Sequence, residues 1–260
     1  MTEAFFEDVA NPEAALLVDL KGMVQRHADN HPRSQQKALG PSEIGHPCLR
    51  KLAQSMVGET GSKQPINPPG DPLPSYIGVA GHAKLEDAVA LDNARYISKL
   101  EPARWLSETK VEVRQGLSGT CDLFDIETGT VIDFKFPGVT AATKFRKDGP
   151  SPEYRIQAHC YGQGFARLGF DVRNVGIWFL PRAGQLRTSF LWTEPYDPKI
   201  VDETLTKIDL AMMFLDDLDV DHHPERFATI PTTPHNCGFC PYWTPMADHP
   251  DPLACQGDSA

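Results

Sequence analysis

Three successive segments in which apolar and polar residues alternate constrain the fold of this chain most strongly. They span 109–114, 119–126 and 130–136, and glycine-containing turns bound them. A period of two is the pattern of β-strands, and short turns between such runs predict antiparallel neighbours. Helical periodicity precedes the strands at about 76–91 and follows them at 153–168. The sequence therefore predicts an α/β domain.

Further elements are predicted on both sides of this region. We expect helices at 12–27 and 42–56, strands at 174–180 and 186–192, and irregular loops at 58–74 and 137–150. A long helix begins at Asp197-Pro198, and its apolar residues, spaced four and three apart, predict one buried stripe. Those residues are Val201, Leu205, Ile208, Met212 and Leu215. Between Tyr76 and Leu180 the predicted order is α-β-β-β-α-β.

Charge and targeting signals limit the classes of protein to consider. The 260 residues include 25 basic and 35 acidic side chains, a net charge of −10. Such a field repels nucleic acid, which excludes a non-specific coating protein but not an enzyme that uses divalent metals. A P-loop motif is missing, so the sequence predicts no ATP motor. It contains no signal-peptide pattern and no apolar run of membrane-spanning length, so we expect no membrane association and a cytoplasmic location, the host cytoplasm for a phage-encoded chain.

The segment 119–138, GTCDLFDIETGTVIDFKFPG, is the most informative part of the sequence. Thr128-Gly129 is a plausible two-residue hairpin turn. It predicts a register that pairs Ile126 with Val131, Phe124 with Asp133 and Asp122 with Lys135. Residues that face each other, or lie two apart, share a sheet face. Two carboxylates and one ammonium therefore converge.

Two interpretations of this convergence remain open. One is a salt-bridged, solvated sheet face. The other is a functional site, because the run VIDFKF is apolar enough for a central strand, where charged groups are costly to bury without a partner. Two carboxylates offer the hard oxygen ligands that Mg²⁺ and Mn²⁺ prefer, and a nearby lysine can orient a metal-bound water.

At the level of motifs, G-T-x-D followed by D-x-K resembles the PD-(D/E)XK nuclease superfamily, whose core order is α-β-β-β-α-β. Two more segments are similar to its RecB-like branch. GHAKLE at 81–86 resembles the helix that supplies a histidine ligand, and His82 matches that position. QAHCY at 157–161 matches the branch's Q-x-x-x-Y motif, with Gln157 and Tyr161 on one helix face.

The resemblance implies a set of site residues. Asp122, Asp133, His82 and the backbone carbonyl of Phe134 would bind the metal, and Lys135 would position or activate the water. Gln157 and Tyr161 would contact DNA or brace the site, and Glu86 would support it from one turn beyond His82. The alternatives are a capping or surface role for His82 and ordinary helix packing for Gln157 and Tyr161.

The activity implied is metal-dependent hydrolysis of DNA phosphodiesters from single-stranded ends, with 5′→3′ polarity in much of the family. A chain without a helicase motor would serve phage recombination, repair or spacer acquisition. The rivals are a double-strand exonuclease of the same superfamily and a non-catalytic DNA-binding or assembly module. The basic residues Lys144, Arg146 and Lys147 could hold the DNA backbone, or could be a solvated loop. The sequence indicates no protein partner or oligomeric state.

Four of the six cysteines lie outside the predicted strand and helix. Cys237 and Cys240 form a C-x2-C pair, Cys255 follows fifteen positions later, and Cys48 lies near the N-terminus. Such a set suggests zinc, a redox pair or an iron–sulfur cluster. The tail after Val220 contains few large apolar residues, so we expect it to need a cross-link. For Cys121 and Cys160 we expect simple burial.

This arrangement resembles the CRISPR-associated, RecB-like exonucleases and the AddB-type helicase–nucleases, in which one cysteine before the core and three after it hold a 4Fe–4S cluster. The resemblance implies a nuclease domain over residues 41–260 and a helical extension over 1–40. Those families place the last cysteine closer to the C-x2-C pair. His235, His249 or Asp248 is therefore an alternative to Cys255, and a mixed set would favour zinc.

Overall fold

The computed structural model describes residues 12–30, 39–56, 66–67, 70–220, 222–246 and 248–257. Most of the loop predicted at 58–74, and residues 1–11 and 31–38 of the predicted extension, lie outside them. The elements run in this order: α1 (Pro12–Asp29), α2 (Pro41–Ile44), α3 (Leu49–Met56), α4 (Leu73–Ile97), β1 (Trp105–Arg114), β2 (Leu117–Asp125), β3 (Thr130–Lys135), α5 (Val139–Asp148), α6 (Pro152–Arg167), β4 (Asn174–Phe179), η2 (Leu186–Thr188), β5 (Phe190–Pro195), α7 (Pro198–Leu218), η3 (Pro224–Thr229) and η4 (Cys237–Phe239).

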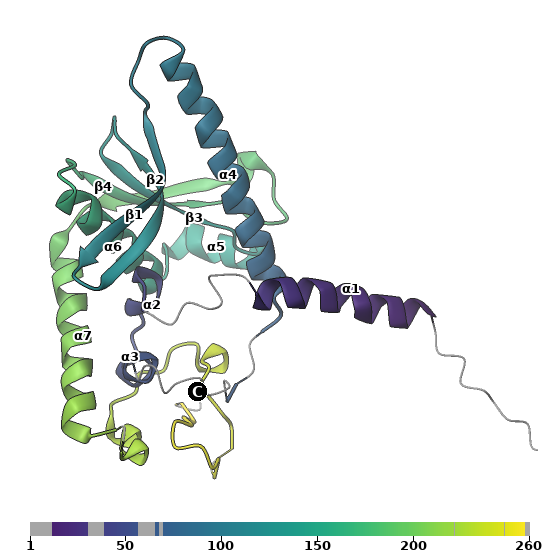
Figure 1. Ribbon diagram of the computed structural model, residues 1–260, viewed down its shortest axis with the longest axis vertical. Coiled ribbons are helices and arrows are strands. Elements are labelled where there is room, and N and C mark those ends of the chain that lie inside the picture. Colours follow the sequence, from purple (N-terminus) through teal and green to yellow (C-terminus); the bar gives the residue numbers. More distant parts are fainter. Residues whose placement is uncertain are drawn as a thin grey trace, which may run out of the picture.

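The five strands form one mixed sheet in the order β1-β2-β3-β4-β5. β3 and β4 are parallel, and the other neighbouring strands are antiparallel. A parallel pair needs a crossover connection, which α5 and α6 supply here (Figure 1). β3 therefore lies in the middle of the sheet. The predicted α/β class is confirmed, as is the order α-β-β-β-α-β, with two crossover helices in place of one.

The hairpin between β2 and β3 differs from the prediction in its register. Phe124 pairs with Val131, whereas the sequence predicted a pairing with Asp133. The predicted two-residue turn is wrong, because residues 126–129 form a four-residue turn. The error amounts to two positions, so each side chain keeps its predicted face.

Asp125, at the end of β2, accounts for the longer turn. Its carboxylate accepts hydrogen bonds from the backbone N–H of Glu127 (3.2 Å) and from the Thr128 hydroxyl (2.7 Å). Arg104 donates to both of its oxygens at 2.8 Å. Gly129 then adopts a φ of 64°, a left-handed value that glycine tolerates. These side-chain bonds stop the strand pairing at Asp125.

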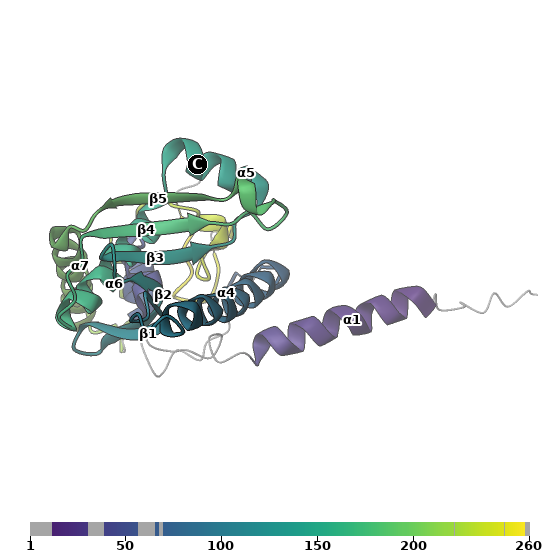
Figure 2. The same cartoon turned by 90° about the horizontal axis from the view of Figure 1, so that it is seen from above.

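Helix α6 packs along the sheet and forms most of the core with it. Phe165 of α6 stacks on Phe124 of β2, with ring centroids 4.4 Å apart. Gly164 lies so close to β1 that a Cβ atom there would be 2.5 Å from the side chain of Val111. Figure 2 shows the strands side by side, with α6 near them. This close packing fixes which α6 side chains reach the strands.

Two other predictions differ from the structure, and a third is confirmed. The loop predicted at 137–150 is wrong: α5 occupies most of it, and its only larger apolar side chain besides Val139 is Phe145. The single helix predicted at 42–56 is split into α2 and α3 at residues 45–48, where Pro47 opposes a continuous helix. Helix α1 is confirmed but lies apart from the sheet (Figure 2), and Leu16 is 59% exposed.

Helix α7 buries a stripe that differs from the predicted one at its C-terminal half. Val201 and Ile208 are buried as expected, but Met212 is half exposed and Ala211 is buried in its place. The buried residues Val201, Thr204, Ile208 and Ala211 step by three, four and three, whereas the predicted stripe stepped by four and three.

The tail is buried in a small core that it shares with α3 and α7, and its need for a cross-link stays a prediction. Phe227, Ile230 and Leu253 are buried against Ala53 of α3 and Ala211 of α7. Gln54 of α3 donates a hydrogen bond to the carbonyl of Leu253 at 2.7 Å. Packing on α3 and α7 therefore contributes to holding the tail.

Of the helices that the structure describes, none has the length and apolar character of a membrane span.

Candidate active site

His82 of α4 and Asp122 of β2 meet in the structure, as the sequence predicted. His82 Nδ1 lies 3.1 Å from Asp122 Oδ1. The other carboxylate oxygen of Asp122 accepts a hydrogen bond of 2.6 Å from the backbone N–H of Phe134 on β3. Gly81 brings the helix to this place, because a Cβ atom there would be 2.5 Å from the ring of Phe136. Asp122 is thus held between α4 and β3.

Glu108 of β1 is a third possible ligand, which the sequence did not predict. One ligand atom each from His82, Glu108 and Asp122 lies within 4.8 Å of the others. The strand was predicted to begin at 109, four residues after its first residue, Trp105, so Glu108 fell outside it. Ser107 pairs with Leu123 and Thr109 with Cys121, so a strand predicted from Trp105 would have placed Glu108 across from Asp122.

The backbone of Glu108 is unusual for a strand residue. Its φ is 44°, in the left-handed region that a residue with a side chain avoids at a cost of about 1–3 kcal/mol. Such strain is found where a side chain must be aimed at a functional site. Here it interrupts the regular alternation of β1 at the point where the carboxylate joins His82 and Asp122.

Asp133 and Lys135 form the buried part of the site. Asp133 is 1% exposed, and Lys135 Nζ lies 2.7 Å from its Oδ2. The contact lacks the alignment of a hydrogen bond, so this buried oxygen has a nearby cation but no aligned donor. Burial is the main reason that the pKa of Asp133 is raised to about 6; Lys135 opposes the rise and the carboxylate of Asp122 adds to it.

Gln157 and Tyr161 extend this contact along α6. Lys135 Nζ donates to Gln157 Oε1 at 3.0 Å, and Gln157 Nε2 donates to the Tyr161 hydroxyl at 3.1 Å. Both α6 residues are buried, and Lys135 Nζ also lies 4.7 Å above the ring of Tyr154. This geometry suits bracing of the site better than contact with DNA, and ordinary helix packing is the remaining alternative. Burial also raises the pKa of Tyr161, which keeps its hydroxyl protonated.

A cavity of about 440 Å³ opens beside these residues. His82, Glu86, Glu108, Asp122 and Tyr161 line it, together with residues 40–42 and 118–120. Glu86 thus lies one turn beyond His82, as expected.

The donor set suits a divalent cation. Two carboxylates and an imidazole are ligands that Mn²⁺ accepts, and Mg²⁺ accepts the carboxylates. The unaligned Asp133 oxygen is a further acceptor in the same region. These residues therefore fit the metal that the sequence motif implies.

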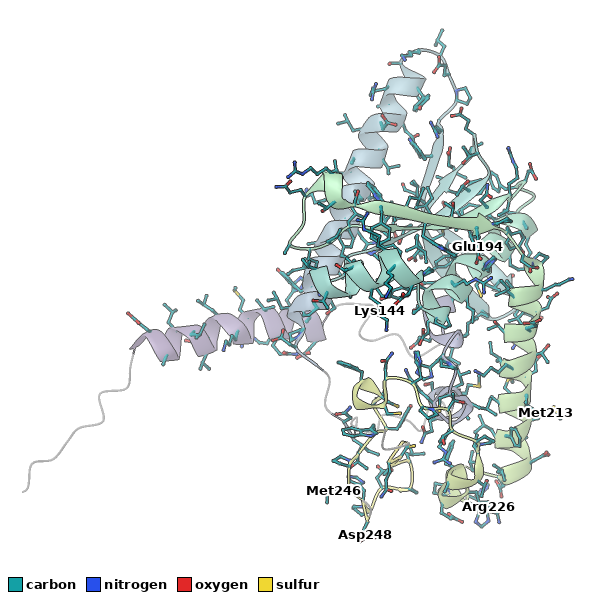
Figure 3. All side chains as sticks on the ribbon, turned by 180° about the vertical axis from the view of Figure 1, so that it is seen from behind. Lys144, Glu194, Met213, Arg226, Met246 and Asp248 are labelled. Atoms are coloured by element: carbon teal, nitrogen blue, oxygen red, sulfur yellow. The ribbon has the colours of Figure 1, made fainter. Side chains whose placement is uncertain are left out.

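The predicted basic loop is the C-terminal half of helix α5. Arg146 donates to the carbonyl of Thr188 at 2.6 Å and lies over the ring of Phe190, so it helps to hold β5. Lys144 and Lys147 are exposed. Lys144 is labelled in Figure 3 beneath α5 and lines a second cavity, between α5, α6, α3 and the tail.

The four outlying cysteines come together in one pocket. Cys48, Cys237, Cys240 and Cys255 all line it. Cys255 pairs as an isolated bridge with Trp243, and Arg50 Nη1 lies 3.7 Å from its sulfur. Cys255 therefore lies with the other three despite its unusual spacing.

The three alternatives to Cys255 as the fourth ligand differ in whether they line the cysteine pocket. His235 lines the same pocket, but neither Asp248 nor His249 is among its described lining residues. Asp248 lies at the far end of the tail (Figure 3). Cys121 and Cys160 are fully buried in the two apolar clusters around α6, as expected.

Comparison with known proteins gives only distant likenesses. No family model and no curated protein matches the sequence. An alkaline exonuclease (LHK-Exo) from Laribacter hongkongensis is 13% identical with a TM-score of 0.48, over 76% of this chain and 97% of that one. Its complex with dAMP gives 14% and 0.41 over the same shares. A phage-related exonuclease from Haemophilus somnus 129PT gives 15% and 0.41, over 67% and 82%. Because these TM-scores are below 0.5, the likenesses carry no conclusion about the function of this chain.

Proposed function

We propose that this chain is a metal-dependent DNA exonuclease of the RecB-like type. The observation that carries the proposal is the joint arrangement of His82, Glu108 and Asp122 beside a lysine held by Asp133 and Gln157. This is the set of groups that hydrolysis of a phosphodiester requires: metal ligands, and a fixed cation next to them.

Each residue has a distinct task in this proposal. A bound Mg²⁺ or Mn²⁺ would polarise the phosphate and supply a nucleophilic water at neutral pH. Asp122, Glu108 and His82 would hold the cation, and Asp133 and the Phe134 carbonyl would be the remaining ligands that the family resemblance implies. Lys135 orients the water and offsets charge on the phosphate oxygens. The water oxygen would bond to phosphorus and lose a proton to solvent, the P–O bond to the leaving nucleotide would break, and the leaving oxygen would take up a proton from solvent.

We further propose a 4Fe–4S cluster held by Cys48, Cys237, Cys240 and Cys255. Tetrahedral zinc at about 2.3 Å from each thiolate would bring the sulfurs to about 3.8 Å from one another. Among the described residues, no three of these sulfurs form a group within 4.8 Å. That spacing favours a larger centre than a single ion, and zinc is the second candidate.

The finer features rest on the family resemblance. They are activity on single-stranded ends, 5′→3′ polarity, a role in recombination, repair or spacer acquisition, and a nuclease domain over 41–260 after an extension over 1–40. A double-strand exonuclease is the nearest rival. A non-catalytic DNA-binding module is the rival of another class, and the complete set from Asp122 to Lys135 argues against it.

Digestion of end-labelled DNA separates these possibilities. Single-stranded and duplex DNA labelled at either end should be tested with Mg²⁺, with Mn²⁺ and with EDTA. Mononucleotides or short oligonucleotides released from single strands with metal, and none with EDTA, support the proposal. Faster digestion of the duplex selects the double-strand enzyme. Binding without cleavage under every metal condition selects the non-catalytic module.

A further inference from the structure

A second group of metal-ligating side chains lies away from the candidate active site. His46 follows α2, Glu153 lies in the first turn of α6, and His235 belongs to the tail. One nitrogen of each imidazole and one carboxylate oxygen lie within 4.8 Å of one another. Two histidines and a carboxylate are a ligand set that zinc uses in proteins. We propose that these three residues bind a divalent transition-metal ion of the zinc type.

The contacts within the group support a shared ligand. His235 Nε2 is in contact with Glu153 Oε1, whereas the buried Glu153 Oε2 has no hydrogen-bond partner. The rings of His46 and His235 lie edge to face, with centroids 5.3 Å apart. A buried carboxylate oxygen without a donor is costly, and a cation bound between the two rings would remove that cost.

A hydrogen bond to His46 and the nearby ammonium groups of Lys51 and Lys207 oppose a cation here. His46 Nδ1 accepts a hydrogen bond of 3.2 Å from the backbone N–H of Cys48. Binding through Nε2 would move the ring proton to Nδ1 and lose that bond, at a cost of about 1 kcal/mol. Lys51 lines the adjoining cavity, but so do the carboxylates of Glu43 and Glu153. The loop itself is held in place, because Lys207 donates to the carbonyls of His46 and Pro47.

The group of His46, Glu153 and His235 fits a single metal ion, whereas the cysteine pocket fits a larger metal centre. Its ligand atoms are close enough for one ion, whereas the four cysteine sulfurs are not grouped so closely in the part of the chain that the structure describes. Since Cys255 lines the cysteine pocket, that pocket has four thiols without His235. His235 is then available to Glu153.

An ion at this place would join three segments that are far apart in the sequence. Glu153 lies one helical turn before Gln157, the residue that accepts a hydrogen bond from Lys135. The ion would therefore anchor the tail to the turn of α6 that precedes the candidate active site. Three protein ligands leave the fourth position of a tetrahedral ion to water or to a further ligand.

Zinc binding to the full chain tests the proposal. The protein carries Asp122→Asn to weaken the candidate active site, is treated with EDTA, and is then titrated with Zn²⁺. Adding Glu153→Gln or His235→Asn should weaken one zinc site per chain by at least about 100-fold and leave the iron content unchanged. Glu225→Gln is the control, because Glu225 pairs with an exposed histidine, His223, in the same tail.

X-ray absorption at the zinc edge identifies the ligands independently of folding differences between variants. The proposal expects nitrogen and oxygen at about 2.0–2.1 Å for the ion that Glu153→Gln removes. A shell of sulfur at about 2.3 Å for that ion would overturn it. Equal zinc binding with and without Glu153→Gln and His235→Asn would overturn it too, as would loss of iron in either variant. No result on DNA cleavage bears on this outcome.

Discussion

At the scale of one residue, Asp133 shows that a side chain of the candidate site can lower the folding stability of the chain. Burial destabilises the ionised form of this carboxylate more than Lys135 stabilises it, and its pKa is therefore raised to about 6. In the folded state the group binds a proton more tightly than in the unfolded chain. Stability is therefore greater at acidic pH and falls as pH rises through the interval from about 4 to about 6.

Replacing Asp133 by Asn should stabilise the metal-free protein above pH 7. The gain is at most about 3 kcal/mol, the cost of ionising a group whose pKa is raised by about two units. It should shrink towards pH 4, where the wild-type carboxyl is protonated. Thermal unfolding in EDTA between pH 4 and pH 8 measures it. A variant less stable than wild type at pH 8 would show that ionised Asp133 stabilises the fold.

Tyr161 allows bracing to be separated from general packing. Removing its hydroxyl with Tyr161→Phe leaves Gln157 Nε2 without its acceptor and should slow DNA cleavage about tenfold through Lys135, while stability falls by about 1 kcal/mol. Tyr196→Phe is the control: the Tyr196 hydroxyl also bonds a glutamine of α6, Gln163, although this contact is part-buried and that of Tyr161 is buried. Equal cleavage rates in the two variants would assign Gln157 and Tyr161 to packing alone.

At the scale of elements, alternation and motif spacing predicted the strands, α6 and the meeting of His82 with Asp122. They did not predict the features that depend on local side-chain hydrogen bonds, on backbone conformation or on few apolar residues. The bonds to Asp125 lengthened the hairpin turn, the left-handed Glu108 lay just outside the predicted strand, and α5 has too few apolar residues to show a helical period. Sequence spacing alone left Cys255 in doubt, because only the folded tail brings it to the other cysteines.

The exposed lysines of α5 belong to this scale. If Lys144 and Lys147 contact phosphates, replacing both by Ala should weaken DNA binding and reduce the slope of log K against log salt by up to about two units, roughly one per lost contact. Lys199→Ala, an exposed lysine of α7, is the control. The measurement is binding across salt concentrations in Ca²⁺ or EDTA. Parallel salt curves for all the proteins would make α5 ordinary surface.

At the scale of the whole molecule, the segment around Cys48 lies against the C-terminal tail, so parts of the chain before and after the sheet are in contact. Arg50 donates to the carbonyls of Ala228 and Ile230, and Asn67 donates to those of Gly238 and Cys240. These contacts bring residues more than 170 positions apart into one unit. A cluster bound there would add its ligand affinity to folding stability.

Replacing Cys48 or Cys255 by Ala should remove the colour of anaerobically purified protein. About four irons per chain are expected in wild type, and the loss of one ligand should release most of them and lower the melting temperature. Cys160→Ala, in the core, should keep its iron. Iron content by elemental analysis measures the effect. A colourless wild-type protein with one zinc per chain would exclude the cluster and leave the nuclease site untouched.

The rate at which Mn²⁺ supports cleavage of end-labelled single-stranded DNA tests the metal-dependent nuclease most directly. Asp122→Asn should lose at least about a hundredfold in rate, and Glu108→Gln should need a higher Mn²⁺ concentration for half of its maximal rate. Glu112→Gln, on the same strand but paired with Arg167, should behave as wild type. Cleavage that persists in EDTA, or an Asp122→Asn protein with the wild-type rate and Mn²⁺ dependence, would contradict the proposed function.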